Sequence, residues 1–213
     1  MREAVDEVMY QALMDQQIFG VCIDFLVIYF DRQGPDELFY YVLDKYYQNN
    51  KVDQYLSNYT KERIKLRRLV SVGAEAPEFS VKDTSGTVVI LSETVNKNEL
   101  CLLFFWRSSC PHCIESMPEI KSLYKEYREI GLEIIGVSLD EQKNDWTAAL
   151  NEHNSNWLNV SDLKGWDSKP AEIYGVVQTP TFFLINQKMI IEKNNSDLNS
   201  IKAHLKSWKN RKK

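Results

Sequence analysis

An unbroken apolar run, Leu100–Trp106, ends four residues before a closely spaced pair of cysteines and constrains the fold more than any other feature of this chain. A run of this kind is typical of a strand that is buried on both faces of a sheet. A helical pattern follows over residues 111–130, and Leu132–Leu139, a mostly apolar run, is predicted as the next buried strand. A right-handed crossover would bring the two runs side by side as parallel strands, so we predict an α/β fold with a central mixed sheet flanked by helices.

Shorter elements complete this part of the chain. Asp83-Thr84-Ser85-Gly86 is a good turn sequence between two strand-like segments, which predicts a hairpin. Asp140 is a plausible N-cap for a helix that reaches Glu152, and Ser196 is a candidate cap for a closing helix. The further predicted strands are 79–82, 87–91, 157–160, 181–185 and 189–192, the last two antiparallel, and the closing helix covers 196–208.

The composition changes near residue 70. Residues 1–70 lack strand-like alternation and carry many aromatic residues at helical spacing, so we predict a small all-α domain there and an α/β domain over 71–213. Gly34-Pro35 marks a helix start, Asn49-Asn50 marks a break, and residues 71–78 are interpreted as a linker. These aromatic residues are interpreted mainly as the core of the helical domain, although they could also line a surface that binds a partner. The predicted helices cover about 3–17, 18–31, 35–49 and 51–68.

Charge and hydropathy exclude some functions. The net charge of −4 argues against nucleic acid as a main partner, because phosphate binding needs clustered positive charge. The longest apolar stretch, Gly20–Phe30, contains Asp24 and is too short to span a bilayer, so we expect no membrane span in this chain. No leader is visible, which fits either a cytoplasmic protein or a leader that lies outside this sequence.

Cys110 and Cys113 carry the predicted chemistry. Cys110 follows the first buried strand at the start of a helix, where unpaired N–H groups and the helix dipole stabilise a thiolate and lower its pKa. Pro111 suits the first turn because its missing N–H costs nothing there. Cys113 returns to the same helix face, within reach of a disulfide. We therefore predict that Cys110 attacks and Cys113 resolves the mixed disulfide.

Pro111 and His112, the two residues between the cysteines, are expected to tune the redox potential of the pair. His112 could place a positive charge or an N–H donor near the Cys110 sulfur. Stabilising the reduced form would make the pair more oxidising than a Gly-Pro version, with a Cys110 pKa well below the free value of about 8.5. A zinc site is not favoured, because there is no second CxxC, so we expect no metal and no cofactor. Cys22 and Cys101 are interpreted as core residues.

Four segments resemble the TlpA/ResA-like branch of the thioredoxin superfamily, which is related to the AhpC/TSA proteins. The resemblance covers about residues 71–210 and implies a thioredoxin-like fold. Its motifs are Phe104-Phe105-Trp106-Arg107-Ser108-Ser109-Cys110-Pro111-His112-Cys113, the opening Val72-Gly73-Ala74-Glu75-Ala76-Pro77-Glu78-Phe79, the helix-kink position Met117-Pro118, and Tyr174-Gly175-Val176-Val177-Gln178-Thr179-Pro180-Thr181.

The resemblance also implies roles for individual residues. Thr179 and Pro180 would form a cis peptide beside the cysteines and would contact substrate together with Trp106. The Trp106 ring would also support the active-site turn, unless it is plain core. The chain departs from relatives at Phe104, where thioredoxin has a buried Asp, and at Ser116, where ResA-like members often have Glu. Glu115 lies one position earlier, so the group that deprotonates Cys113 stays open.

These observations favour an enzyme that reduces or rearranges disulfides in other proteins. The resemblance to envelope proteins of Bacteroides-type bacteria implies a periplasmic or cell-envelope location, with the cytoplasm as the alternative. The expected partners are proteins with cysteines or disulfides and a thiol–disulfide electron donor or acceptor. Two other interpretations remain: a thiol peroxidase, although the PxxxTxxC pattern is absent before Cys110, and a partner-binding or assembly module in which the redox pair is secondary.

Overall fold

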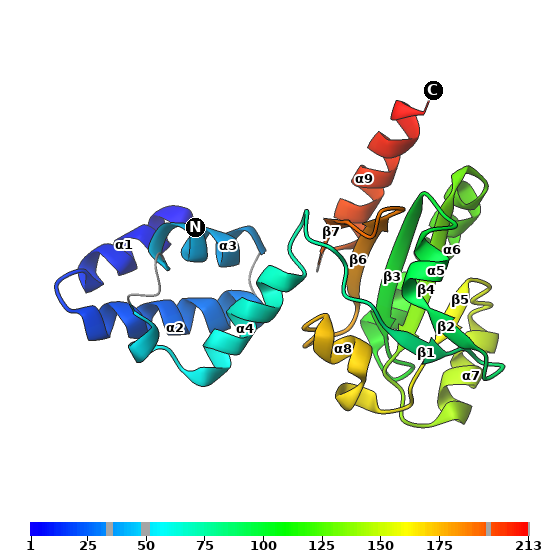
Figure 1. The fold of residues 1–213 in the computed structure, drawn as a ribbon, viewed down its shortest axis with the longest axis horizontal. Helices are drawn as coiled ribbons and strands as arrows, with labels where there is room; N and C mark the ends of the chain where they lie inside the picture. The colour runs from blue at the N-terminus through cyan, green and yellow to red at the C-terminus, as the bar shows by residue number, and fades with distance from the viewer. Residues whose placement is uncertain (33–35, 48–51, 195–196, 213) are drawn as a thin grey trace. The chain divides into compact units, whose positions relative to one another are not determined.

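The computed structural model describes residues 1–32, 36–47, 52–194 and 197–212 (Figure 1). The chain divides into two compact units, Met1–Arg67 and Arg68–Lys213, whereas the sequence pattern placed the boundary at residue 70. Within these described stretches no helix is both long enough and apolar enough to cross a bilayer.

The first unit is helical. Its elements are α1 (Arg2–Ala12), α2 (Gln16–Arg32), α3 (Asp36–Tyr46), the short 3-10 helix η1 (Asp53–Tyr55) and α4 (Asn58–Leu69), which ends just inside the second unit. α4 begins later than predicted because η1 forms a separate turn and the hydroxyl of Ser57 accepts the Thr60 N–H (3.1 Å) as a cap. The predicted helix start at Gly34-Pro35 and the break at Asn49-Asn50 lie outside the described residues.

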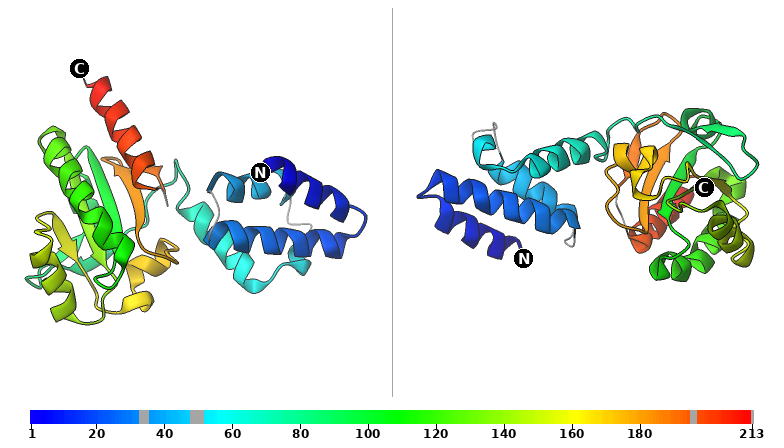
Figure 2. Two further views of the ribbon diagram at one scale, coloured as in Figure 1. Left: turned by 180° about the vertical axis from the view of Figure 1, so that it is seen from behind. Right: turned by 90° about the horizontal axis from the view of Figure 1, so that it is seen from below.

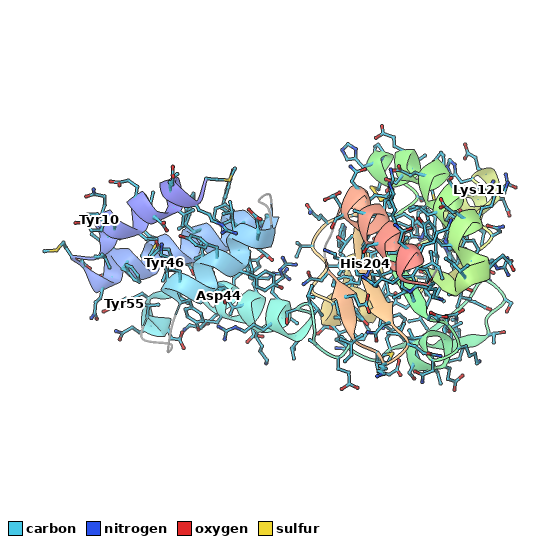
Figure 3. All side chains as sticks on the ribbon, turned by 90° about the horizontal axis from the view of Figure 1, so that it is seen from above. Tyr10, Asp44, Tyr46, Tyr55, Lys121 and His204 are labelled. Carbon is cyan, nitrogen blue, oxygen red and sulfur yellow. A yellow bond between two sulfur atoms is a disulfide. The ribbon has the colours of Figure 1, made fainter. Side chains whose placement is uncertain are left out.

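Two polar clusters connect the helices of this unit. In the first, Asp31 of α2 is buried and binds Arg63 of α4 through two contacts of 2.6 and 3.0 Å, while Arg67 lies 3.5 Å from the same carboxylate. In the second, Asp6 of α1 accepts hydrogen bonds from Tyr41 (2.6 Å) and from Tyr46, the residue labelled on α3 in Figure 3. These bonds, with that of Lys45, lower the Asp6 pKa to about 2.

The second unit is built on a five-stranded mixed sheet with the order β5-β4-β3-β6-β7 (Figures 1 and 2). β3, β4 and β5 are parallel, and β6 and β7 are antiparallel to their neighbours, so the predicted parallel pairing of the two apolar runs is confirmed. A separate hairpin joins β1 and β2. The strands are β1 (Ser80–Lys82), β2 (Val88–Ile90), β3 (Leu100–Trp106), β4 (Leu132–Ser138), β5 (Leu158–Val160), β6 (Thr181–Asn186) and β7 (Ile191–Lys193).

Helices cover both faces of the sheet, as expected for a thioredoxin-like fold. The side chains of β3 alternate, so Phe104 and Trp106 pack on one face with α6, α7 and α9, and Leu103 and Phe105 pack on the other with α5 and α8. The helices are α5 (Leu91–Val95), α6 (Pro111–Tyr127, extended by the 3-10 helix η2, Arg128–Ile130), α7 (Lys143–Glu152), η3 (Gly165–Asp167), α8 (Lys169–Ile173) and α9 (Leu198–Arg211). The short helices α5 and α8 were not predicted.

Three predicted features, a linker and two helix caps, differ from the structure or lie outside the described residues. The predicted linker is not free chain, because Gly73 and Ala74 exchange backbone hydrogen bonds with Ile191 of β7 (2.8 and 2.9 Å). Asp140 does not cap a helix, since α7 begins at Lys143. The predicted cap Ser196 lies outside the described residues. The described cap of α9 is Asp197, which accepts the Ser200 N–H (3.0 Å).

Candidate active site

The two cysteines lie where β3 gives way to α6. Cys110 is the N-cap residue of α6, and Pro111 occupies the first turn, as predicted. The sulfurs of Cys110 and Cys113 form a disulfide, with Cα atoms 5.3 Å apart. Cys110 is half-buried and Cys113 is fully buried, so only the first sulfur is open to attack by a substrate.

The surroundings of the Cys110 sulfur suit a thiolate. The backbone N–H of Cys113 donates to it over 3.2 Å, in the place where a Ser or Asp cap would accept the same bond. The positive end of the α6 dipole adds to this contact, and no acidic side chain in the first turn of the helix opposes it. Reduction of the disulfide would therefore leave a stabilised anion on Cys110.

The loop before β6 approaches the same sulfur from the other side. The Thr179–Pro180 peptide bond is cis, as the resemblance implies, and the carbonyl oxygen of Thr179 lies 3.4 Å from Cys110 Sγ. β6 runs antiparallel to β3, with Thr181 paired to Phe105, and this pairing brings the loop to the end of β3. Residues 69 positions apart thus meet at one site.

His112 points away from the core. Its side chain is 82% exposed, and its Nδ1 lies 3.3 Å from Oε2 of Glu115. The hydroxyl of Ser116 donates to the backbone carbonyl of His112 (2.7 Å). Glu115 and Ser116 therefore both form hydrogen bonds with His112. These are the two positions that the sequence offers for a proton acceptor of Cys113.

Asp140 is a site residue whose role the sequence did not predict. Its side chain is buried and accepts bonds from the Ser108 hydroxyl (2.6 Å), the Ser108 N–H (3.1 Å) and the Ser138 hydroxyl (2.7 Å). It therefore connects the end of β4 to the turn that precedes Cys110. The sequence could have indicated this role, because Asp140 directly follows a predicted buried parallel strand. The carboxyl ends of parallel strands meet at one edge of the sheet, where functional sites form.

Trp106 is fully buried and stacks on Phe104, with ring centroids 6.1 Å apart. The structure therefore places it beneath the turn and not on a surface that a substrate could contact. An exposed aromatic residue, Trp166, follows Gly165. A Cβ on Gly165 would meet Glu141, and Glu141 forms a 3.5 Å ion pair with Arg107 in the turn before Cys110.

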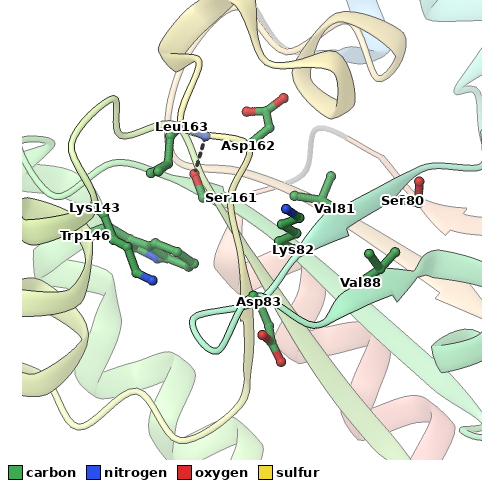
Figure 4. Close-up of a pocket in the computed structure, with 11 residues that line it drawn as sticks. Ser80, Val81, Lys82, Asp83, Val88, Lys143, Trp146, Ser161, Asp162 and Leu163 are labelled. Atoms are coloured by element: carbon green, nitrogen blue, oxygen red, sulfur yellow. Dashed lines mark hydrogen bonds between the residues drawn. The ribbon is translucent and has the colours of Figure 1, made fainter.

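A separate pocket lies between the β1–β2 hairpin and α7, and its lining residues do not include the redox pair (Figure 4). Trp146 and Lys143 border it from α7, and Ser161 borders it from the loop after β5. The site at Cys110 is therefore distinct from this pocket.

The fold and the site together define a class of protein. A mixed sheet of this order, a CxxC pair at the start of the helix after a central strand, and a cis-proline loop beside it are the features of a thioredoxin-fold protein with a dithiol–disulfide centre. Comparisons with known proteins then give the family. The model of the AhpC/TSA family matches residues 72–194, more than half of the chain, and the chain belongs to that family.

Individual relatives support the same assignment. The chain is 32% identical over 117 residues to the thiol-disulfide oxidoreductase ResA of Bacillus subtilis, a match that covers 55% of this chain and 63% of ResA, less than two thirds of its length. A thiol-disulfide oxidoreductase from Bacteroides fragilis is similar in structure, with a TM-score of 0.59, 29% identity, and coverage of 63% of this chain and 98% of that one.

One similar structure includes the helical unit as well. A thioredoxin-like protein from Bacteroides caccae matches 96% of this chain and 75% of its own, with a TM-score of 0.74. Its identity of 21% shows a shared fold alone.

Proposed function

We propose that this protein is a thiol–disulfide oxidoreductase that reduces or rearranges disulfides in other proteins through Cys110 and Cys113. The observation that carries the proposal is the asymmetry of the pair: one sulfur is half-exposed at a helix N-terminus, and the other is buried behind it. The names of ResA and of the Bacteroides fragilis protein support this class of activity.

In the first step of the reductive direction, the Cys110 thiolate attacks one sulfur of the substrate disulfide. The substrate S–S bond breaks, a mixed disulfide forms, and the leaving substrate thiolate takes up a proton. In this proposal the backbone of the cis-proline loop binds the substrate chain on either side of its cysteine, which the position of the Thr179 carbonyl, 3.4 Å from Cys110 Sγ, supports.

In the second step, Cys113 loses its proton and attacks Cys110 Sγ. The mixed disulfide breaks, the second substrate thiolate leaves and is protonated, and the Cys110–Cys113 disulfide forms. The substrate gains two electrons and two protons. A dithiol donor of another protein must then reduce the pair before the next turnover.

The direction of electron flow depends on the reduction potential. His112 favours a more oxidising couple when it is protonated, but the Glu115 carboxylate 3.3 Å away offsets part of its charge. We therefore propose a reductase or isomerase and not a strong oxidant. A potential near −270 mV would agree with this, and one near −120 mV would contradict it.

We place the protein outside the cytoplasm, in the periplasm or cell envelope, on the resemblance to envelope proteins of Bacteroides-type bacteria. Cell fractionation tests this location. An epitope-tagged copy found with cytoplasmic markers would contradict it.

The activity is tested by reduction of insulin disulfides with a small dithiol as electron source. Cys110→Ser should abolish the reaction, and Cys113→Ser should accumulate a mixed disulfide that is visible on a non-reducing gel. Cys22→Ser is the matched control, because it removes a half-buried cysteine of the helical unit and should leave the rate unchanged. Full activity in Cys110→Ser would refute the proposal.

A further inference from the structure

Three buried polar atoms converge on one glycine in the core of the second unit. The register pairs Gly136 of β4 with Phe104 of β3 on one side and with Asn159 of β5 on the other. A Cβ on Gly136 would lie 2.5 Å from Asn159 Oδ1, 2.9 Å from Trp157 Nε1 and 3.3 Å from Trp106 Nε1. No side chain fits there without displacing polar groups, which is a physical reason for glycine at this position.

All three atoms lack a hydrogen-bond partner among the described residues. The side chains that carry them are nine-tenths or more buried, with exposures of 0% for Trp106, 5% for Trp157 and 6% for Asn159. Leaving two indole N–H donors and one amide acceptor unsatisfied in a core is costly, and such groups in native proteins normally bond to protein or to ordered water.

The amide orientation of Asn159 is fixed by its other atom. Its Nδ2 donates to the carbonyl oxygens of Trp157 (2.7 Å) and Ser155 (3.1 Å), so Oδ1 must be the acceptor that faces Gly136. Two donors and one acceptor that face the same glycine match the bonding pattern of a water molecule packed against Gly136, because water can accept two hydrogen bonds and donate one.

We propose that one water molecule is bound here in the core, and that through it Asn159 and Trp157 position Trp106 beneath the redox pair. The second half of this inference rests on the proposed function. Two connections support it. Trp106 is the last residue of β3, four positions before Cys110. Met117, one helical turn after Cys113, has its Sδ 3.8 Å from the Ser155 hydroxyl, and Ser155 also holds Asn159.

The water is detected by NMR on the full oxidised chain. The five tryptophans give five indole N–H resonances, which single Trp→Phe variants assign. We expect cross-peaks between a long-lived water and the indole protons of Trp106 and Trp157. Their loss in Gly136→Ala would place the water over the glycine. If Gly136→Ala does not fold, loss of the Trp106 cross-peak in Trp157→Phe tests the same point.

The positioning role is tested by the rate at which iodoacetamide alkylates reduced Cys110. Trp157→Phe should change that rate by about twofold or more, the range expected for a coupled residue that does not touch the thiol. Trp146→Phe is the matched control, since Trp146 is also buried with an unpartnered indole N–H but borders the pocket in Figure 4. It should leave the rate unchanged.

Two results would overturn the inference. Absence of water cross-peaks at both indole protons, or a crystal structure that shows a direct indole–Asn159 bond or an empty space, removes the water site. Equal alkylation rates in Trp157→Phe and Trp146→Phe remove the positioning role. Neither readout uses disulfide reduction, so a failed insulin assay would refute the proposed function and leave the water site standing.

Discussion

Replacing Asp140 with alanine should destabilise the second unit and disorder the turn before Cys110. The carboxylate accepts from the Ser108 hydroxyl, the Ser108 N–H and the Ser138 hydroxyl. A hydrogen bond to a charged group contributes about 1.5–3 kcal/mol, but both hydroxyls can turn toward other acceptors, so we expect a loss of about 3 kcal/mol. For a chain of this length that lowers the melting temperature by roughly 6–12 °C.

Asp140→Asn gives a sharper test with little change in shape. Oδ1 faces the Ser108 hydroxyl and Oδ2 faces the Ser138 hydroxyl, so an amide nitrogen must oppose one of them in either orientation. We expect about half the loss of Asp140→Ala, measured by thermal unfolding. Asp145→Asn, on the exposed side of α7, is the control and should stay within about 0.5 kcal/mol of the wild type. If Asp140→Asn melts together with this control, the carboxylate does not hold the turn.

Four further predictions concern single groups elsewhere. Asp31→Asn should destabilise the helical unit by about 1.5–3 kcal/mol in urea unfolding, because it removes the buried carboxylate charge that Arg63 contacts twice, and an unchanged midpoint would contradict this. Asp6 has a folded pKa of about 2 against an ordinary 3.8, so its stabilisation is complete above pH 4 and is lost as the pH falls toward 2. In an acid titration followed by circular dichroism, Asp6→Asn should reduce the loss of helical signal between pH 4 and pH 2. An unchanged titration curve would show that other groups determine this loss. Burial raises the pKa of Cys101, so mass spectrometry after iodoacetamide treatment of the oxidised native protein should find Cys22 labelled and Cys101 unlabelled. Trp166→Ala should lower kcat/KM for insulin by about tenfold, as expected for loss of an aromatic contact, without changing alkylation of Cys110 by iodoacetamide. Equal losses in both assays would indicate a structural role.

The sequence predicted the central strands of the second unit but not its short helices. The runs Leu100–Trp106 and Leu132–Leu139 predicted β3 and β4 and their parallel pairing, because a strand buried on both faces needs mostly apolar residues. The helices of five residues, α5 and α8, are too short to show a helical period, so the pattern could not reveal them.

The site was predicted only where its residues are neighbours in the chain or match a family motif. Cys110 and Cys113 are three positions apart, and the structure places the motif residue Thr179 beside Cys110. Asp140 depends on Ser108, 32 positions away, and only the folded sheet brings the two together. The sequence also could not predict which way the His112 ring points, because one helical turn has both a buried and an exposed face.

The first stretch of the second unit, up to Asp83, contacts both edges of the sheet. Glu75 forms a bridge with Ile190 beside β7, and Asp83 forms a bridge with Val160 of β5. β5 and β7 are the outermost strands, and their open backbone groups would otherwise be templates for pairing with another chain. A shortened protein that begins after residue 83 would expose both edges at once and would be prone to self-association. The unit that can be separated cleanly therefore starts near Arg68, with this protective stretch retained.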